Sequence, residues 1–269
     1  KKLLFYRKTQ RNPYMVGLPG FPVFAIEGKN ITHYAQSSFN YPFDAAQSLR
    51  LHGGIRNDKL RILVTDSLSN KLPSQLDENW LFAKAEYIFD NTSPVTLNII
   101  KGLRAKAYVE FHKPFEGTID EERVKMKFNN TGWLGVIGVD ARHYQRVSRQ
   151  ITWANRFASA VSVGNKRLLY RLGGVENWLA FDPQKKYEFS TIEDTRYTYA
   201  FQSYVTQLRG FKQNIRKGTS YALLNSELRI PLFLYLARNP LRSEFFRSFQ
   251  IVGFADFGAA WTGISPFND

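Results

Sequence analysis

The sequence predicts an all-β protein, and within that class an antiparallel transmembrane β-barrel. Three observations favour it: strict alternation of apolar and polar residues, alternating segments of about nine to eleven residues, and connections that alternate between short and long. From Leu103 to Phe111 the odd positions are Leu, Ala, Ala, Val and Phe, while the even positions are Arg, Lys, Tyr and Glu. No segment shows a comparable run at helical spacing, so the pattern indicates strands.

The expected strands cover most of the chain. Residues 1–46 are unassigned and are either early barrel strands or a linker into the barrel, which is predicted over 47–269. The strands are expected at 47–56, 57–66, 80–91, 101–112, 132–145, 149–162, 221–232 and 247–260. Their length suits a tilted crossing of a bilayer, and their charged polar face suits a water-filled lumen. A soluble sandwich or barrel is the alternative, because any antiparallel sheet with one wet face alternates.

The connections between these strands differ in length in a regular way. They lie at 56–58, 67–79, 91–99, 113–131, 146–148, 163–220 and 233–246, and are short, long, moderate, long, short, very long and moderate in turn. Outer-membrane barrels have short periplasmic turns opposite long external loops. The link at 233–246 fits this scheme least well, because it should be short.

Four tryptophans lie near the ends of the expected strands. Trp80, Trp133 and Trp261 fall where a strand meets a proposed external loop, and Trp153 falls near a proposed periplasmic end. Aromatic girdles at both interfaces of a membrane barrel have this arrangement. The alternative is that these tryptophans are core or girdle residues of a soluble barrel.

The charge of the chain raises the question of nucleic acid. The formal net charge is +14, and 15% of the residues are aromatic, a composition that can suit nucleic-acid binding. The basic residues are nevertheless spread over the polar faces and loops, without a recognition-helix or RNA-binding-sheet signature. Excess Lys and Arg can equally meet acidic lipid headgroups. We therefore expect the lipid bilayer and its outer-leaflet lipids as partners and no nucleic acid, with a basic nucleic-acid-binding β protein as the less favoured alternative.

Signatures of catalysis are weak, so we predict that the protein is not an enzyme and uses no metal or cofactor. The chain has no cysteine and no G-x-S-x-G, P-loop or Rossmann motif. The four histidines, which lack metal-ligand spacing, are His33, His52, His112 and His143. Glu227 and Asp256 could form an acid/base pair of carboxylates. A charge network on the inward face explains both residues better.

Three motifs resemble a known family. They are QLRGF at 207–211, LLNSELRIPLF at 223–233 and VGFADFGAAW at 252–261. In this order and spacing they are similar to the C-terminal barrel of the BamA/TamA-type outer-membrane assembly superfamily, also called the bacterial surface antigen barrel. The Gly173–Gly174 pair in RLGGVENW is similar to the Gly-Gly element that precedes the arginine motif in that family.

Two further stretches, YIFDNTSP at 87–94 and WANRFA at 153–158, resemble the version of this barrel found in Bacteroidota. The likeness covers about 80–269. It implies a sixteen-stranded barrel in the outer membrane of a Gram-negative bacterium, incomplete in this chain, which we expect to be a piece of a longer protein.

The implied function is to assist the insertion or translocation of proteins at the outer membrane, without a cofactor. The implied partners are other outer-membrane or periplasmic proteins of a complex, together with client outer-membrane proteins. The alternative is an accessory or anchoring barrel subunit of a larger secretion, assembly or uptake complex, without insertase activity.

The resemblance also implies a site. In that family the long external loop folds back into the barrel, and its motif arginine pairs with an acidic residue on the wall. On this sequence Arg209 would bind Asp256, which the alternation places on the inward face, with Glu227 as a second possible partner. A guanidinium in a partly dehydrated lumen needs a carboxylate and can bind one bidentately. Gly210 would permit close backbone approach and Phe211 would pack on the lumen wall, completing a lumen latch. The alternative is that Arg209 is a solvated loop cation.

Overall fold

The fold is seen in a computed structural model of the chain. The structure describes residues 2–16, 24–62, 75–96, 99–120, 123–127, 132–148, 150–174, 198–205, 208–211, 215–236 and 242–266. These residues form an all-β fold with mostly antiparallel pairing, which confirms the predicted class at that level. Within these ranges the helices are α1 (Leu232–Leu236) and α2 (Glu244–Ser248), and neither has the length and apolar character needed to cross a membrane.

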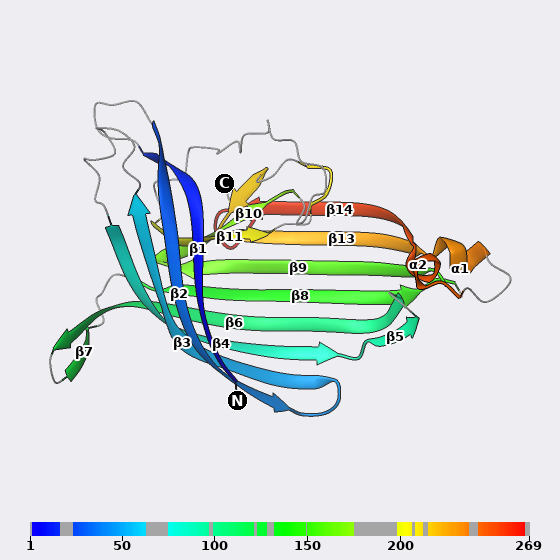
Figure 1. The fold of residues 1–269 in the computed structure, drawn as a ribbon, viewed down its shortest axis with the longest axis horizontal. Helices are drawn as coiled ribbons and strands as arrows, with labels where there is room; N and C mark the ends of the chain where they lie inside the picture. Colours follow the sequence, from blue (N-terminus) through cyan, green and yellow to red (C-terminus); the bar gives the residue numbers. More distant parts are fainter. Residues whose placement is uncertain are drawn as a thin grey trace.

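One large sheet contains most of the strands (Figure 1). Its strands are β1 (Lys2–Val16), β2 (Phe24–Pro42), β3 (Gln47–Ile62), β4 (Gln75–Asp90), β5 (Ser93–Thr96), β6 (Ile99–Asp120), β7 (Arg123–Lys127), β8 (Leu134–Arg146), β9 (Thr152–Gly164), β13 (Ser220–Ile230) and β14 (Ile251–Trp261). Their order is β1-β2-β3-β4-β6-β8-β9-β13-β14, with β5 and β7 paired to β6. Over the described residues β1 and β14 are its two edges, so the sheet is not closed into a barrel.

A second, three-stranded sheet lies in the connection between β9 and β13. It consists of β10 (Lys166–Leu172), β11 (Thr198–Val205) and β12 (Arg216–Gly218), with β10 in the middle. β10 pairs in parallel with β11 and antiparallel with β12. The predicted very long loop at 163–220 is therefore partly strand, and its residues 175–197 lie outside the described ranges.

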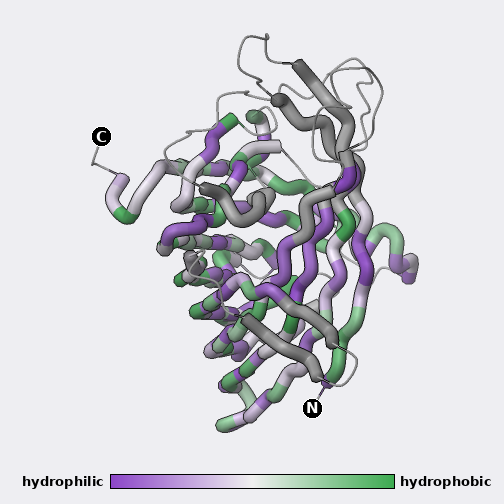
Figure 2. The backbone as a smooth tube through the Cα atoms, turned by 90° about the vertical axis from the view of Figure 1, so that its left-hand side faces the viewer, coloured by the Kyte–Doolittle hydropathy of each residue, from purple (hydrophilic) through white to green (hydrophobic). Residues whose placement is uncertain are grey.

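The large sheet has two chemically different faces. We call the face that packs against β10 the inner face and the opposite one the outer face. Even-numbered residues of β4, β6, β8 and β9 lie on the inner face, and the register preserves this parity, since Lys106 lies opposite Asp140 and Val109 opposite Ile137. Figure 2, which looks nearly along these strands, shows hydrophilic and hydrophobic residues alternating within them. This is the period-two pattern that the sequence predicted.

One predicted turn is wrong. Residues 56–58 are not a connection, because β3 runs without a break from Gln47 to Ile62. Their polar side chains find partners on the neighbouring strands: the Thr32 hydroxyl donates to Asp58 at 2.6 Å, and Asn57 Nδ2 donates to Asn79 Oδ1 at 2.8 Å. Cross-strand hydrogen bonds of this kind satisfy a polar stretch within a sheet, so the polarity of this stretch does not require a turn.

The first part of the chain, which received no assignment from sequence, extends the same sheet. β1 pairs with β2 from Lys2 opposite Ser38 to Val16 opposite Phe24, and β2 pairs with β3. A short connection at 43–46 joins β2 to β3. There the Asp44 carboxylate accepts hydrogen bonds from the backbone N–H groups of Ala46 and Gln47, each at 2.7 Å, which fixes the turn.

The connections lie at two opposite ends of the sheet. The turn end carries 43–46, 91–98, 147–151 and 231–250, and the loop end carries the connection that contains β10, β11 and β12. The predicted tight turn at 146–148 is present, closed by the Val147 N–H donating to the Ile151 carbonyl at 3.0 Å. The link between β13 and β14 is longer than predicted and contains α1 and α2 (Figure 1).

Candidate functional site

Arg209 makes a bidentate contact with Asp256. Its Nε donates to Asp256 Oδ2 at 2.7 Å and its Nη2 donates to Oδ1 at 2.7 Å, while its backbone N–H donates to Oδ2 at 2.9 Å. The Asp256 side chain is 1% exposed. A carboxylate this deeply buried requires a charged, hydrogen-bonded partner, and the fork geometry of a guanidinium supplies both. The contact expected from the motif is thus present, and Arg209 is not a solvated loop cation.

Glu227, considered from sequence as an alternative partner, is a second partner of the same guanidinium. Arg209 Nη1 donates to Glu227 Oε1 at 2.6 Å. Arg229 donates to the other carboxylate oxygen, Oε2, from Nε at 2.9 Å and from Nη2 at 2.7 Å. The cluster therefore contains two arginines and two carboxylates. Arg229 was missed from sequence, although it shares the polar face with Glu227 two residues away.

An aromatic ring completes the cluster. The Arg209 guanidinium carbon lies 4.0 Å from the centre of the Phe254 ring, a cation–π contact. Phe254 lies opposite Glu227 in the β13–β14 register, on the same face as Asp256. The sequence did not identify Phe254. Phe211, which was expected to pack on the lumen wall, is 49% exposed, and its packing there stays a prediction. The hydrogen bonds that Arg209 donates to Asp256, and then the one it donates to Glu227, raise the pKa of Arg209 above its ordinary value, so the residue stays cationic at any pH of interest.

Two glycine motifs bring this arginine to the sheet. Gly173 and Gly174 adopt φ of 120° and 84°, conformations that side chains disfavour, and Gly174 forms a β-bridge with Leu208. Gly210, with φ of 82°, forms the turn that follows Arg209. The Gly-Gly element and the arginine motif, which are distant in sequence, are therefore neighbours in space.

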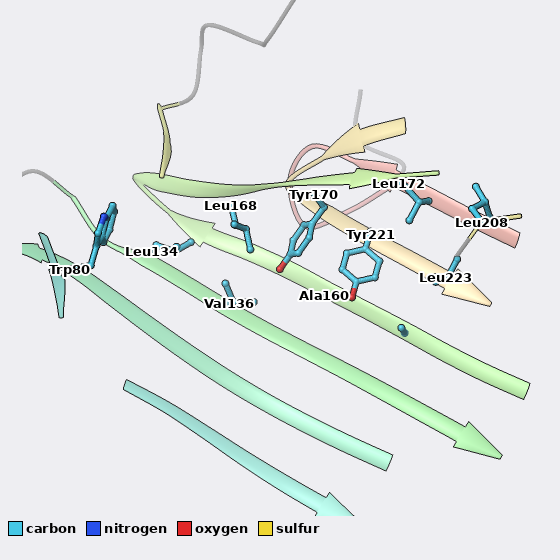
Figure 3. Packing of buried hydrophobic residues seen from close by; sticks show 11 residues of the cluster. Trp80, Leu134, Val136, Ala160, Leu168, Tyr170, Leu172, Leu208, Tyr221 and Leu223 are labelled. Atoms are coloured by element: carbon cyan, nitrogen blue, oxygen red, sulfur yellow. The ribbon is translucent and has the colours of Figure 1, made fainter. Parts of the chain in front are cut away.

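A buried apolar cluster holds the connecting segment against the inner face (Figure 3). Leu168, Tyr170 and Leu172 of β10, together with Leu208, contribute the side chains of this segment. On the sheet side the cluster contains Trp80, Leu134, Val136, Ala158, Ala160, Tyr221 and Leu223. The Tyr170 and Tyr221 rings lie edge to face at 4.7 Å between centres. Burial of this many apolar groups stabilises the docked position of the segment independently of the ion pairs.

Gly258 makes room for this docking. A Cβ at position 258 would lie 2.7 Å from Leu172 Cδ2 and 3.0 Å from Leu208 Cδ1. We expect Gly258→Ala to lower the free energy of unfolding by about 1–3 kcal/mol, as overpacking does. Gly253→Ala on the same strand is the matched control, since a Cβ there meets no atom within 4 Å. Thermal unfolding of the detergent-solubilised protein measures both, and equal melting temperatures would contradict the packing argument.

Trp80 does not belong to an outer girdle. It is fully buried on the inner face within the apolar cluster, and the Lys166 ammonium, which also forms an ion pair with Glu78, lies 5.0 Å from its ring centre. Its even number already placed it on the same face as Lys84 and Glu86. The position of Trp80 near a strand end was a weaker guide than this parity.

The other three tryptophans of the predicted girdle lie at outer-face positions near strand ends. Trp133 is 38% exposed and stacks on Phe111 with 5.8 Å between ring centres, at the loop end. Trp261 ends β14 at the same end, and its Nε1 donates to the Ile264 carbonyl at 3.3 Å. Trp153 is 43% exposed at the turn end. Their placement suits a girdle, and that role stays a prediction.

Comparison of the chain with protein-family models gives no match, and comparison with curated proteins gives none either.

The chemistry available at the cluster is charge neutralisation and positioning. Both Asp256 and Glu227 are engaged by guanidinium groups, so neither offers a free carboxylate for proton transfer. Within the described ranges no three His, Asp or Glu side chains gather in a way that could hold a metal ion. His52 and His112 instead contact Glu86 and Glu110 on the inner face. The arrangement can hold a long segment against the sheet.

Proposed function

We propose that the sheet is the wall of an outer-membrane β-barrel of the assembly and translocation type, in a Gram-negative bacterium. The observation that carries the proposal is the segregation of exposed apolar side chains. In β4, β6, β8 and β9 the exposed large hydrophobic residues all lie on the outer face: Leu81, Tyr87, Val109, Phe111, Ile137, Trp153 and Phe157.

An outer face of this kind fits lipid better than water. The apolar surface continues onto the neighbouring strands, where Leu224, Leu228 and Phe257 are also exposed. Water-soluble proteins rarely expose contiguous apolar patches of more than a few hundred Å². The inner face, by contrast, carries ion pairs such as Lys84–Glu86 at 3.1 Å and Arg156–Asp140 at 2.7 Å. Apolar outside and charged inside is the pattern of membrane barrels.

Aromatic side chains at both ends of the sheet support the same proposal. The Phe111–Trp133 stack lies at the loop end. At the turn end, Phe233 contacts Phe246 and Phe249 with ring centres 4.9 and 5.4 Å apart. Aromatic rings concentrate at membrane–water interfaces because they have apolar bodies and can accommodate polar surroundings. A complete barrel additionally needs partners for the β1 and β14 edges, since unpaired strand edges are not stable in lipid.

The assembly and translocation part of the proposal rests on the arginine cluster and the docked segment. In the proposed barrel the segment that contains β10 fills part of the lumen, and Arg209 holds it against β13 and β14 through Asp256 and Glu227. An accessory or anchoring barrel would use the same architecture. The two roles differ in whether the protein acts on other outer-membrane proteins during their assembly. Cells depleted of the protein should accumulate unassembled outer-membrane proteins if it acts in assembly, and should not if it is an anchor.

Membrane extraction tests the barrel itself. We expect the full-length protein to remain in the outer-membrane fraction after carbonate and high-salt washing and to be released by detergent. Because closed barrels resist detergent unfolding, the unheated protein should migrate faster in gel electrophoresis than the heated one. Recovery in the soluble fraction, without detergent and without heat-dependent migration, would rule out the proposal.

A further inference from the structure

A row of arginines crosses the inner face at a distance from the Arg209 cluster. Arg104 of β6 lies directly opposite Arg142 of β8, and Arg142 lies directly opposite Arg156 of β9. Like charges directly opposite each other on neighbouring strands destabilise a sheet. Three adjacent guanidinium groups therefore require negative charge close to them.

The carboxylates beside the row supply part of this charge. Asp140 accepts from Arg156 Nε at 3.2 Å and Nη2 at 2.7 Å, and Arg142 Nε is 3.4 Å from the same carboxylate. Asp90 lies 3.1 Å from Arg104 Nε. The side chains of Arg104 and Arg142 remain 59% and 41% exposed. Each guanidinium has five N–H donors, so both arginines keep donors free for a ligand.

A cavity of about 460 Å³ lies beside Arg104 and Arg142 at the turn end of the sheet. Two more cations, Arg50 and Lys106, line it. In the described part of the chain Arg50 has no ion pair, and Lys106 has only a long one, 3.7 Å from Glu86. Cations from β3, β6 and β8 thus converge on one open space.

Four acidic residues line the cavity beside its four cations: Asp44, Glu86, Asp90 and Asp140. All four already have partners, and Asp90 and Asp140 bind Arg104 and Arg142 of the row. Glu86 is also paired with Lys84 at 3.1 Å and with His52 at 3.3 Å. Asp44 accepts hydrogen bonds from the backbone of its own turn. Asp140 is shared between two arginines, as described above. Glu86 and Asp140 are shared with Lys84, His52 and Arg156, which lie outside the lining. The four carboxylates therefore do not fully offset the four lining cations, which favours an anion in the cavity.

We propose that this cavity binds a phosphate group. A phosphate at neutral pH carries close to two negative charges and at least three acceptor oxygens, so it can engage guanidinium groups from several strands at once. A carboxylate has only two oxygens and one charge. The volume lies within the usual range for small-molecule sites, and rings of Arg and Lys are used in anion and phosphate pores. The phosphate belongs either to a soluble phosphorylated molecule or to a lipid headgroup. The site is formed by inner-face residues and the 43–46 turn, so the inference does not depend on the assembly function.

Calorimetric titration of the full-length, detergent-solubilised protein with inorganic phosphate tests this site, in a phosphate-free buffer of low ionic strength. We expect saturable binding to the wild type. Arg104→Gln and Arg142→Gln should each weaken it by about tenfold or more, because each removes charge-assisted hydrogen bonds. Arg142→Lys keeps the charge and loses the planar fork. Its affinity for phosphate should therefore lie between that of the two Gln variants and that of the wild type. Arg247→Gln in α2, outside the cavity, should bind as the wild type does.

Thermal unfolding provides a second readout that separates binding from misfolding. Phosphate should raise the melting temperature of the wild type and of Arg247→Gln, and should leave that of Arg104→Gln and Arg142→Gln unchanged. Without phosphate, Arg142→Gln should be at least as stable as the wild type, because the like-charge row is interrupted. Absence of saturable binding, or equal affinity in wild type, Arg104→Gln and Arg142→Gln, would overturn the proposal.

Competition distinguishes the two sources of phosphate. Mixed micelles that contain an anionic phospholipid should displace bound phosphate if the natural ligand is a lipid headgroup. Soluble glycerol phosphate should displace it in either case. Displacement by glycerol phosphate alone therefore supports a soluble ligand. Displacement by both glycerol phosphate and the phospholipid micelles supports a lipid headgroup. If neither competitor displaces the bound phosphate, the result counts against a phosphate site.

Discussion

Arg209→Ala is expected to lower the free energy of unfolding by an amount on the order of 3–5 kcal/mol. The reason is the burial of its partner: the Asp256 side chain is 1% exposed and would lose both arms of a bidentate contact. Glu227 would keep Arg229, so most of the penalty falls on Asp256. Urea unfolding of the protein reconstituted in lipid vesicles, followed by tryptophan fluorescence, measures the change.

A double-mutant cycle with Asp256→Ala tests whether the two residues act as a pair. The double variant should be less destabilised than the sum of the single variants, because removing the second partner relieves the unpaired charge left by the first. The stability of Arg209→Lys should lie between that of the wild type and that of Arg209→Ala, since lysine retains the charge and loses the planar fork of donors. Arg216 lies in the same connection but is exposed, so Arg216→Ala is the matched control and should change stability by no more than about 0.5 kcal/mol. Additive effects would show that the contact contributes no coupling.

Phe157→Arg is expected to lower the free energy of unfolding of the protein in a bilayer by about 2–4 kcal/mol. Phe157 is 45% exposed near the middle of β9, and its cross-strand neighbours on the outer face are Ala141 and Leu224. In the proposed barrel this position lies deep in the hydrocarbon region, where a guanidinium loses its hydration. Folding into vesicles, followed by heat-dependent migration, measures the loss.

The control for Phe157→Arg is the same substitution near the edge of the proposed hydrocarbon region, because the cost of a charged side chain falls toward the interface. Ile251→Arg introduces the same group on the outer face at the first residue of β14, near the turn end, and should cost only about 0–1 kcal/mol. If water bathed the outer face, both substitutions would be nearly neutral in stability and would increase solubility, since each places a charge on an exposed apolar surface. Equal and small effects of the two substitutions would therefore contradict the membrane proposal.

The arginine cluster shows how far local sequence reasoning reaches. Alternation placed Asp256 and Glu227 on one face, and the arginine motif suggested a guanidinium to meet them. The contact of Arg209 with both carboxylates agrees with that reasoning. Phe254 shows its limit, because the ring that meets the guanidinium depends on how the segment approaches the sheet, and no local pattern encodes that approach.

The polar stretch at 56–58 shows a second limit. It interrupts the alternation of β3 as a turn would, and the apolar positions change parity between Ile55 and Leu60. The structure continues the strand because Thr32 of β2 and Asn79 of β4 supply hydrogen-bond partners across the sheet. Those partners are distant in sequence, so a reading confined to this stretch could not include them.

The sequence by itself determined the strands as a class, the chemical difference between the two faces and the inward position of Asp256, because side chains alternate with a period of two along any strand. Only the tertiary structure decided that Trp80 is buried in the apolar cluster beside Lys166, the first residue of β10, and that Arg104, Arg142 and Arg156 lie in one row. The physical reason is register. Alternation fixes the face on which a residue lies, whereas its neighbours on that face depend on how each strand slides against the next, and that is decided by packing and hydrogen bonding over the whole sheet.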